Sequence, residues 1–191
     1  YGAATNRLKD NVNRYIAGTN FSYAPTSWLN FNYRLGVDTY TDNRFRTAPG
    51  PRGIPGERTY DNAEGFVGDF NTGYRAVNST FLANATTKLT SNITGTLRLG
   101  YELYDRSLKE SGTLGSQLSI YNDFRLVNAR TFAVSQGKTE YRSNGYFGEA
   151  NFDYKDFLFL SLTGRQDVTS TLSPENRSFF YPSASLSYVF S

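Results

Sequence analysis

The chain of 191 residues contains no cysteine, no histidine and no methionine. Without cysteine it has neither disulfides nor a thiolate nucleophile, and without histidine it lacks the usual zinc ligands and any imidazole base. Its longest uninterrupted apolar run is Phe157-Leu158-Phe159-Leu160, whereas a membrane-spanning helix needs roughly 20 apolar residues. These absences exclude whole classes of enzyme, and they predict no catalytic residue and no resident metal.

The sequence also lacks a start methionine and a signal peptide, since it opens on Tyr1 without a basic stretch followed by an apolar one. A mature or trimmed protein would explain this, but the features below favour an internal piece of a longer chain. The 20 Lys and Arg and 17 Asp and Glu give a net charge of +3. Because the basic residues are scattered singly, nucleic acid is not a predicted partner.

Aromatic residues and glycine are abundant, with 15 Tyr, 15 Phe and 17 Gly, a composition that suits strands and turns. Residues 29–38 show the pattern most clearly, because apolar or aromatic residues alternate with polar ones or glycine. Successive side chains of a strand point to opposite faces, so this segment has one apolar and one polar face. Such a strand fits between lipid and a water-filled lumen, and it also fits on a soluble core.

The alternation recurs and predicts seven strands, at about 13–24, 28–40, 73–89, 93–105, 140–154, 157–167 and 178–190. Their connections alternate between short turns, at 24–27, 90–92 and 155–156, and longer loops, at 41–72, 106–139 and 168–177. Outer-membrane barrels have short periplasmic turns and long extracellular loops. The predicted fold class is therefore all-β, a segment of an antiparallel transmembrane β-barrel. A soluble antiparallel sandwich also alternates and is the alternative.

In the barrel interpretation, the two faces of each strand have different surroundings. The side chains expected to face lipid are Leu29, Phe31, Leu35, Val37, Leu97, Leu99, Leu158, Leu160, Leu162 and Leu186. The charged side chains expected to face the lumen, toward its extracellular half, are Arg34, Asp38, Arg98, Glu102, Arg165 and Asp167. These charges either touch substrate or, as is common inside barrels, form ladders between strands or anchor a plug.

Five acidic residues in the predicted loop 41–72 raise the question of a Ca²⁺ site, because carboxylates are the ligands that this ion prefers. They are Asp42, Glu57, Asp61, Glu64 and Asp69. Their spacing matches no compact calcium-binding loop, so a solvated loop is the favoured interpretation. No other cofactor is predicted.

Residues 145–191 carry an ordered series of motifs. A strand ends in Asp153-Tyr154, a two-residue turn follows, and the next strand ends in Gly-Arg-Gln-Asp at 164–167, before Asn-Arg at 176–177 and Tyr-Pro-Ser at 181–183. This series, about 45 residues long, resembles the barrel of SusC/RagA-type TonB-linked outer-membrane transporters. The earlier part of the chain is similar only in architecture. Because Arg165 and Asp167 belong to the family pattern, the resemblance indicates a structural role for them at the strand end.

The resemblance implies a larger barrel, of the 22-stranded class with a plugged lumen, and a plug domain and TonB box outside this sequence. It further implies import of a bulky nutrient, an oligosaccharide or oligopeptide, across the outer membrane of a Gram-negative bacterium. The implied partners are a SusD-like lipoprotein, the TonB–ExbB–ExbD complex, outer-membrane lipid and the nutrient oligomer. The alternatives are another large outer-membrane barrel, such as a secretion channel or porin, and a soluble β-sandwich that binds glycans at the cell surface.

Overall fold

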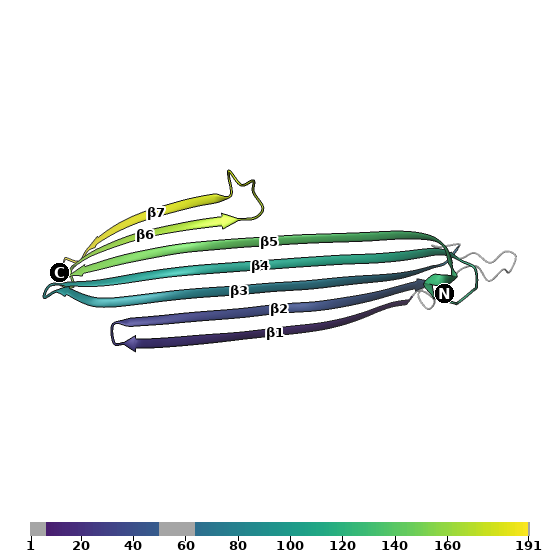
Figure 1. Ribbon diagram of the computed structural model, residues 1–191, viewed down its shortest axis with the longest axis horizontal. Coiled ribbons are helices and arrows are strands. Elements are labelled where there is room, and N and C mark those ends of the chain that lie inside the picture. The colour runs from purple at the N-terminus through teal and green to yellow at the C-terminus, as the bar shows by residue number, and fades with distance from the viewer. Residues whose placement is uncertain (1–6, 50–63, 191) are drawn as a thin grey trace. The chain divides into compact units, whose positions relative to one another are not determined.

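The computed structural model describes residues 7–49 and 64–190, and these form a single antiparallel sheet (Figure 1). Its strands are β1 (Arg7–Thr26), β2 (Leu29–Ala48), β3 (Phe66–Thr90), β4 (Ile93–Leu118), β5 (Ala129–Tyr154), β6 (Leu158–Thr169) and β7 (Ser178–Tyr188). Each strand pairs with its neighbours in sequence, in the order β1 to β7. The all-β fold class is confirmed. Within the described part of the chain, no helix has the length and apolar character that crossing a membrane requires.

The chain folds into two compact units. Unit 1 comprises Tyr1–Tyr15, Thr39–Arg75 and Ser107–Thr139, and unit 2 comprises Ile16–Asp38, Ala76–Arg106 and Glu140–Ser191. Strands β1 to β5 contribute residues to both units, whereas β6 and β7 belong wholly to unit 2.

In unit 2 the register keeps all the leucines of β6 on one face. Leu160 lies opposite Phe152 on β5 and Leu186 on β7, whereas the next residue, Ser161, lies opposite Asn151 and Ser185. A slip of one residue would exchange the apolar and polar faces of the strand, so the apolar pattern itself specifies this register.

The predicted tight turn between β5 and β6 is present. Lys155 and Asp156 have φ values of 52° and 61°, and the Phe157 N–H donates a hydrogen bond of 3.2 Å to the Tyr154 carbonyl. Positive φ at both central residues is what a type I′ turn requires, and its twist matches that of the flanking strands. The Asp153 carboxylate accepts a further bond from the Asp156 N–H at 2.9 Å.

The two longest predicted loops were wrong in extent. β2 continues to Ala48 and β3 begins at Phe66, so only 49–65 of the predicted loop 41–72 lies between strands, and its residues 50–63 lie outside the described residues. β4 continues to Leu118 and β5 begins at Ala129, so the predicted loop 106–139 shrinks to 119–128. Polar residues occupy both faces of these extensions, and without an apolar face the period-2 signal of a strand disappears. β1 likewise begins at Arg7, before the predicted start at 13.

The connection between β4 and β5 is a compact loop built around Asn128. Its side-chain NH₂ donates to the carbonyls of Ile120 and Asp123, at 2.9 and 2.8 Å, and its Oδ1 accepts from the Ile120 N–H at 3.0 Å. Asn128 is buried, and Asn128 itself lies at the end of a 3-10 turn, Leu126–Asn128. Arg125 binds both carboxylate oxygens of Asp123, and this hydrogen bonding lowers the pKa of Asp123. One buried amide therefore fixes the shape of the loop.

Candidate functional site on the polar face of the sheet

Unit 2 presents one face of large apolar side chains that the described residues leave uncovered. Leu99 is 50% exposed and Leu186 is 69% exposed. The rings of Phe31 and Phe81 stack on neighbouring strands, with centroids 6.1 Å apart. The β5–β6–β7 register places further predicted lipid-facing leucines, Leu158, Leu160 and Leu162, in one continuous row of apolar side chains. A contiguous apolar surface of this kind marks contact with another molecule or with a membrane.

The opposite face of unit 2 is polar, and its charged groups are paired across strands. Arg165 on β6 donates from Nη2 to Glu102 on β4 at 2.9 Å and from Nε to Asp167 at 2.8 Å. Its guanidinium lies 5.6 Å from the ring centroid of Phe147 on β5. Gly100 makes room for this ring, because a Cβ there would come within 2.0 Å of the Phe147 ring. This first network therefore ties three consecutive strands together.

A second network on the same face centres on Arg98 of β4. Its Nη1 donates to Glu149 on β5 at 2.8 Å, and its Nε donates to Asn84 on β3 at 2.9 Å. The other Glu149 oxygen accepts from the Asn151 side chain at 2.7 Å. Four of the six charged residues predicted to face the lumen, Arg98, Glu102, Arg165 and Asp167, thus belong to the two networks, whereas Arg34 and Asp38 belong to neither.

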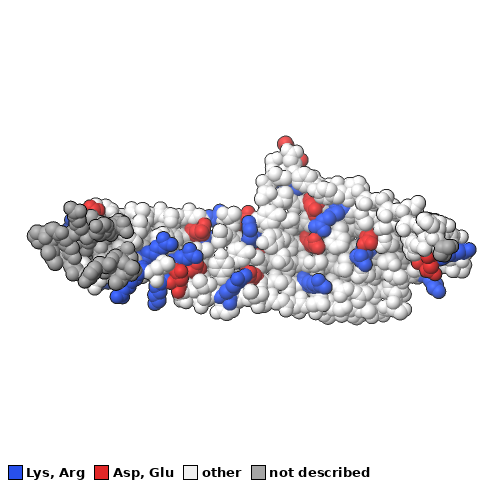
Figure 2. All heavy atoms as spheres, turned by 180° about the vertical axis from the view of Figure 1, so that it is seen from behind, with Lys and Arg blue, Asp and Glu red and all other residues white. Residues whose placement is uncertain are grey.

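These ion pairs are partly exposed to solvent. The side chains of Arg165 and Glu102 are 41% and 43% exposed, and exposed ion pairs contribute only about 0.2–1 kcal/mol each. On this face, charges gather in small clusters of both signs, separated by uncharged surface (Figure 2). Each of the two guanidinium groups, of Arg98 and of Arg165, already donates to two polar side chains. The partners Asn84, Phe147, Glu149 and Asn151 were absent from the predicted set, although the alternation of β5 places the last three on one face.

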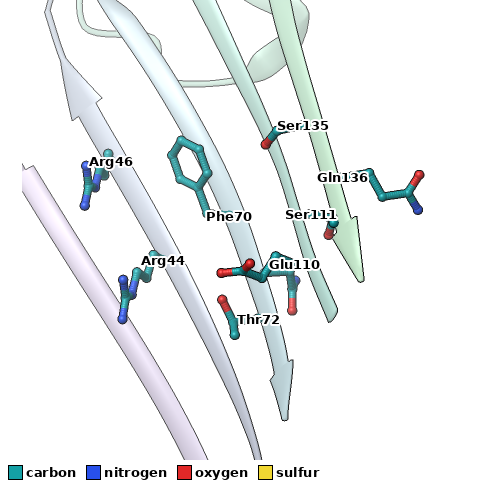
Figure 3. Close-up of a pocket in the computed structure, with 10 residues that line it drawn as sticks. Arg44, Arg46, Phe70, Thr72, Glu110, Ser111, Ser135 and Gln136 are labelled. Carbon is teal, nitrogen blue, oxygen red and sulfur yellow. The ribbon is translucent and has the colours of Figure 1, made fainter. Parts of the chain in front are cut away.

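Unit 1 carries a hollow of about 430 Å³ on its own surface. Arg44 and Arg46 of β2, Phe70 and Thr72 of β3, and Glu110 of β4 line it, together with residues of β5 (Figure 3). The Arg46 guanidinium lies 5.8 Å from the Phe70 ring centroid. Two glycines accommodate this ring, since a Cβ at Gly112 would lie 2.5 Å from it and a Cβ at Gly68 would lie 2.6 Å from it.

The charged side chains in the hollow are not equally available to a ligand. Arg44 forms an ion pair of 2.6 Å with the buried carboxylate of Asp42, and this hydrogen bond raises the pKa of Arg44. Arg46 and Glu110 are exposed, so a cation and an anion face the space beside one aromatic ring. That combination suits a polar oligomer that carries charges of both signs. These residues were missed at the sequence level because 41–48 and 106–118 were predicted to be loop.

The calcium hypothesis gains no support from the described residues. Asp42 is held by Arg44, and in the described ranges, 7–49 and 64–190, no three His, Cys, Asp or Glu side chains gather closely enough to bind a metal ion. Glu57 and Asp61 lie outside these residues.

Comparison with known proteins adds a structural likeness. No protein-family model matches the chain, and no curated protein matches it. Among solved structures, the chain resembles a chain in the "Structure of the RagAB peptide transporter" with a TM-score of 0.81 and 14% identity, over 95% of this chain and 20% of that one. It also resembles chains of the RagAB peptide importer in the "closed-closed" and "open-open" states, each with a TM-score of 0.75, 16% identity and the same coverage. The chain spans only a fifth of these transporter chains, and the likeness establishes its fold as that of a β-barrel segment.

Proposed function

We propose that the chain forms part of the wall of a SusC-like, TonB-dependent importer in the outer membrane of a Gram-negative bacterium. The observation that carries the proposal is the division of unit 2 into an uncovered apolar face and an ion-paired polar face. A barrel wall between lipid and water needs this division. The likeness to RagAB transporter chains along 95% of this chain supports the same function.

In this proposal, each face has one task. The apolar side chains contact the acyl chains of membrane lipid, and the residues concerned are Leu29, Phe31, Leu35, Val37, Leu97, Leu99, Leu158, Leu160, Leu162 and Leu186. The polar face lines the lumen, where the Arg98 and Arg165 networks hold the strands in register. The importer works with a SusD-like lipoprotein and is driven by the TonB–ExbB–ExbD complex. Transport involves no covalent chemistry.

The hollow of unit 1 is the proposed contact with the nutrient. Arg46, Phe70 and Glu110 offer a cation, an aromatic ring and an anion within one space of about 430 Å³. An oligopeptide has carboxylates, ammonium groups and apolar side chains that match all three, whereas a neutral oligosaccharide leaves the charges unmatched. We therefore place oligopeptides ahead of oligosaccharides as the substrate class.

Binding of peptide and oligosaccharide mixtures to the purified protein in detergent tests this assignment. We expect Arg46→Ala combined with Glu110→Ala to weaken peptide binding at least about a hundredfold, since hydrogen bonds to charged groups contribute about 1.5–3 kcal/mol each and the double variant removes two such groups. Asn43→Ala is the matched control, because Asn43 adjoins Arg44 on β2 and its side chain points to the other face. If the double variant and the wild type bind peptide equally well, the hollow is not a contact site for the nutrient.

The competing functions make different predictions. A porin or secretion channel would work in cells that lack TonB, so nutrient uptake that persists without TonB contradicts the proposal. A soluble β-sandwich requires two sheets packed face to face, whereas the described strands form one sheet. Such a protein would also remain in solution without detergent.

A further inference from the structure

The hollow of unit 1 contains one cation and one anion that form no ion pair with another of the described residues. Arg44 is held by the buried carboxylate of Asp42, so this pair carries no net charge. Arg46 contacts the Phe70 ring instead, and Glu110 has no ion-pair partner in the described part of the chain. Arg46 and Glu110 are both exposed, so these two charges are available to a ligand.

The pairing of β2 with β3 fixes where Arg46 lies relative to the Phe70 ring. Tyr40 on β2 and Tyr74 on β3 stack with ring centroids 4.9 Å apart, so these two residues lie opposite each other. In an antiparallel pair, four steps forward on one strand match four steps back on the other. Arg44 is therefore opposite Phe70, and Arg46 lies two residues further along β2.

The pairing of β3 with β4 fixes the position of Glu110 in the same way. A Cβ at Gly112 would meet the Phe70 ring, and a Cβ at Gly68 would meet Leu114, so Gly112 is opposite Phe70. Glu110 lies two residues before Gly112 on β4. Because β2 and β4 run in the same direction on either side of β3, Arg46 and Glu110 lie on opposite sides of the Phe70 ring (Figure 3).

The distance between the two charges matches the length of a short peptide. Two strand spacings of about 4.8 Å and four residues of about 3.4 Å separate the Cα atoms of Arg46 and Glu110 by about 17 Å. The Arg46 guanidinium reaches to 5.8 Å from the Phe70 ring centroid, so the charged groups are closer together, at roughly 10–17 Å. An extended chain advances about 3.4 Å per residue, so this distance corresponds to about three to five residues.

We propose that the hollow binds peptides of about three to five residues by both of their ends. Glu110 accepts hydrogen bonds from the terminal ammonium group, and Arg46 donates two parallel hydrogen bonds to the terminal carboxylate. Phe70 contacts an apolar side chain between the two ends. This inference rests on the proposed function and adds to it the length and the direction of the bound peptide.

The test measures how the whole protein in detergent binds a tetrapeptide of alanine with one central leucine. Its forms have free ends, an acetylated N-terminus, an amidated C-terminus or both modifications. We expect each modification to weaken binding at least about tenfold, because each removes a charge-assisted hydrogen bond. Acetylation should have no further effect on binding to Glu110→Gln, and amidation should have no further effect on binding to Arg46→Gln.

Lys109→Gln is the matched control for these variants. Lys109 adjoins Glu110 on β4, but its side chain points to the other face, so this variant should respond to both modifications as the wild type does. Peptide length gives a second readout. The tetrapeptide should bind at least about tenfold more tightly than a dipeptide or an octapeptide of the same kind, because their ends do not match the spacing of the two charges.

Three results would overturn the inference: equal binding of the doubly modified and the free tetrapeptide, equal binding of the octapeptide and the tetrapeptide, or acetylation that acts through Arg46. Failure of the proposed function has a different outcome. Doubly modified peptides whose tight binding still requires Arg46 and Glu110 would contradict recognition of the ends and retain the hollow as the nutrient contact. Nutrient uptake that persists without TonB, together with end-dependent binding, would contradict the proposed function and retain the inference.

Discussion

Leu162→Arg tests whether the apolar face of unit 2 lies in a membrane. Leu162 sits on β6 opposite Ala150 and Ala184, four residues along from Leu158, which lies between Tyr154 and Tyr188. Tyrosines at this end of the strands are expected at the membrane interface, and the apolar band is about 25 Å tall with strands tilted by about 40°. Half the band then corresponds to about 16 Å along a strand, or about five residues. Leu162 is therefore close to the midplane.

An arginine at the midplane of a barrel costs about 2–4 kcal/mol, which corresponds to a change of about 30-fold to 1,000-fold in the folding equilibrium. Thr163→Arg is the matched control, because Thr163 follows Leu162 on β6 and lies on the other face, opposite Glu149. There the arginine side chain reaches water and an acidic neighbour, so we expect a change of less than about 1 kcal/mol. Guanidinium-induced unfolding of the protein in lipid vesicles measures both variants.

Equal destabilisation by the two arginines would refute the assignment of the faces. A larger cost for Thr163→Arg would mean that the ion-paired face is the enclosed one. A soluble fold would also reveal itself in this assay, because the wild type would unfold at the same denaturant concentration with and without lipid vesicles.

Three further predictions concern the polar face and the β4–β5 loop. Gly100→Ala should destabilise the protein by about 1–3 kcal/mol, because the added methyl group overpacks against Phe147. In a denaturation assay, adding Phe147→Ala to this variant should restore most of the lost stability. No recovery would contradict the contact between Gly100 and the Phe147 ring. Arg165→Gln should lower stability by no more than about 2 kcal/mol, because its two ion pairs are partly exposed, and the difference from wild type should shrink in 1 M salt; a salt-independent effect would point to packing instead. The Asp123 carboxyl should titrate below its usual range, because it accepts hydrogen bonds from Arg125. Carbon NMR should therefore show that the pKa of Asp123 rises in Arg125→Gln. An unchanged pKa would mean that the pair does not persist in solution.

The sequence was sufficient to predict the strands of unit 2, because there the physical signal is strong. Strand β6 was predicted at 157–167 and is observed at Leu158–Thr169, since Leu158, Leu160 and Leu162 alternate with polar residues. The turn at Lys155 and Asp156 was also predictable, because two polar residues between alternating strands favour a hairpin.

The strand extensions in unit 1 were not predictable from alternation. Residues 41–48 read Thr-Asp-Asn-Arg-Phe-Arg-Thr-Ala, with charged residues at even positions and a mixture of polar and aromatic residues at odd ones. Neither face is uniformly apolar, so no hydrophobic period marks the strand. The strand extends here because its backbone groups pair with those of neighbouring strands, and backbone pairing leaves no mark on the side-chain pattern.

The ion-pair networks show a second limit of sequence reasoning. Alternation placed Arg98 and Glu102 on the same side of their strand, but it did not identify Glu149 as the partner of Arg98, 51 residues away. The register between β4 and β5 decides that pairing, and the length of the β4–β5 loop decides the register. The loop was predicted to span 106–139 and in fact spans 119–128. For this reason the register between β4 and β5 could not be predicted from the sequence.

The neighbour-by-neighbour order of the strands has a consequence for how the protein is made. Each strand pairs with the one that follows it in sequence, so every pairing step closes a small loop, and small loops form at low entropic cost and quickly. The sheet can therefore form one hairpin at a time, in the order in which the strands are synthesised. Until the next hairpin arrives, the last strand displays a row of unpaired backbone groups that attracts other chains. Covering this edge during assembly would prevent such pairing.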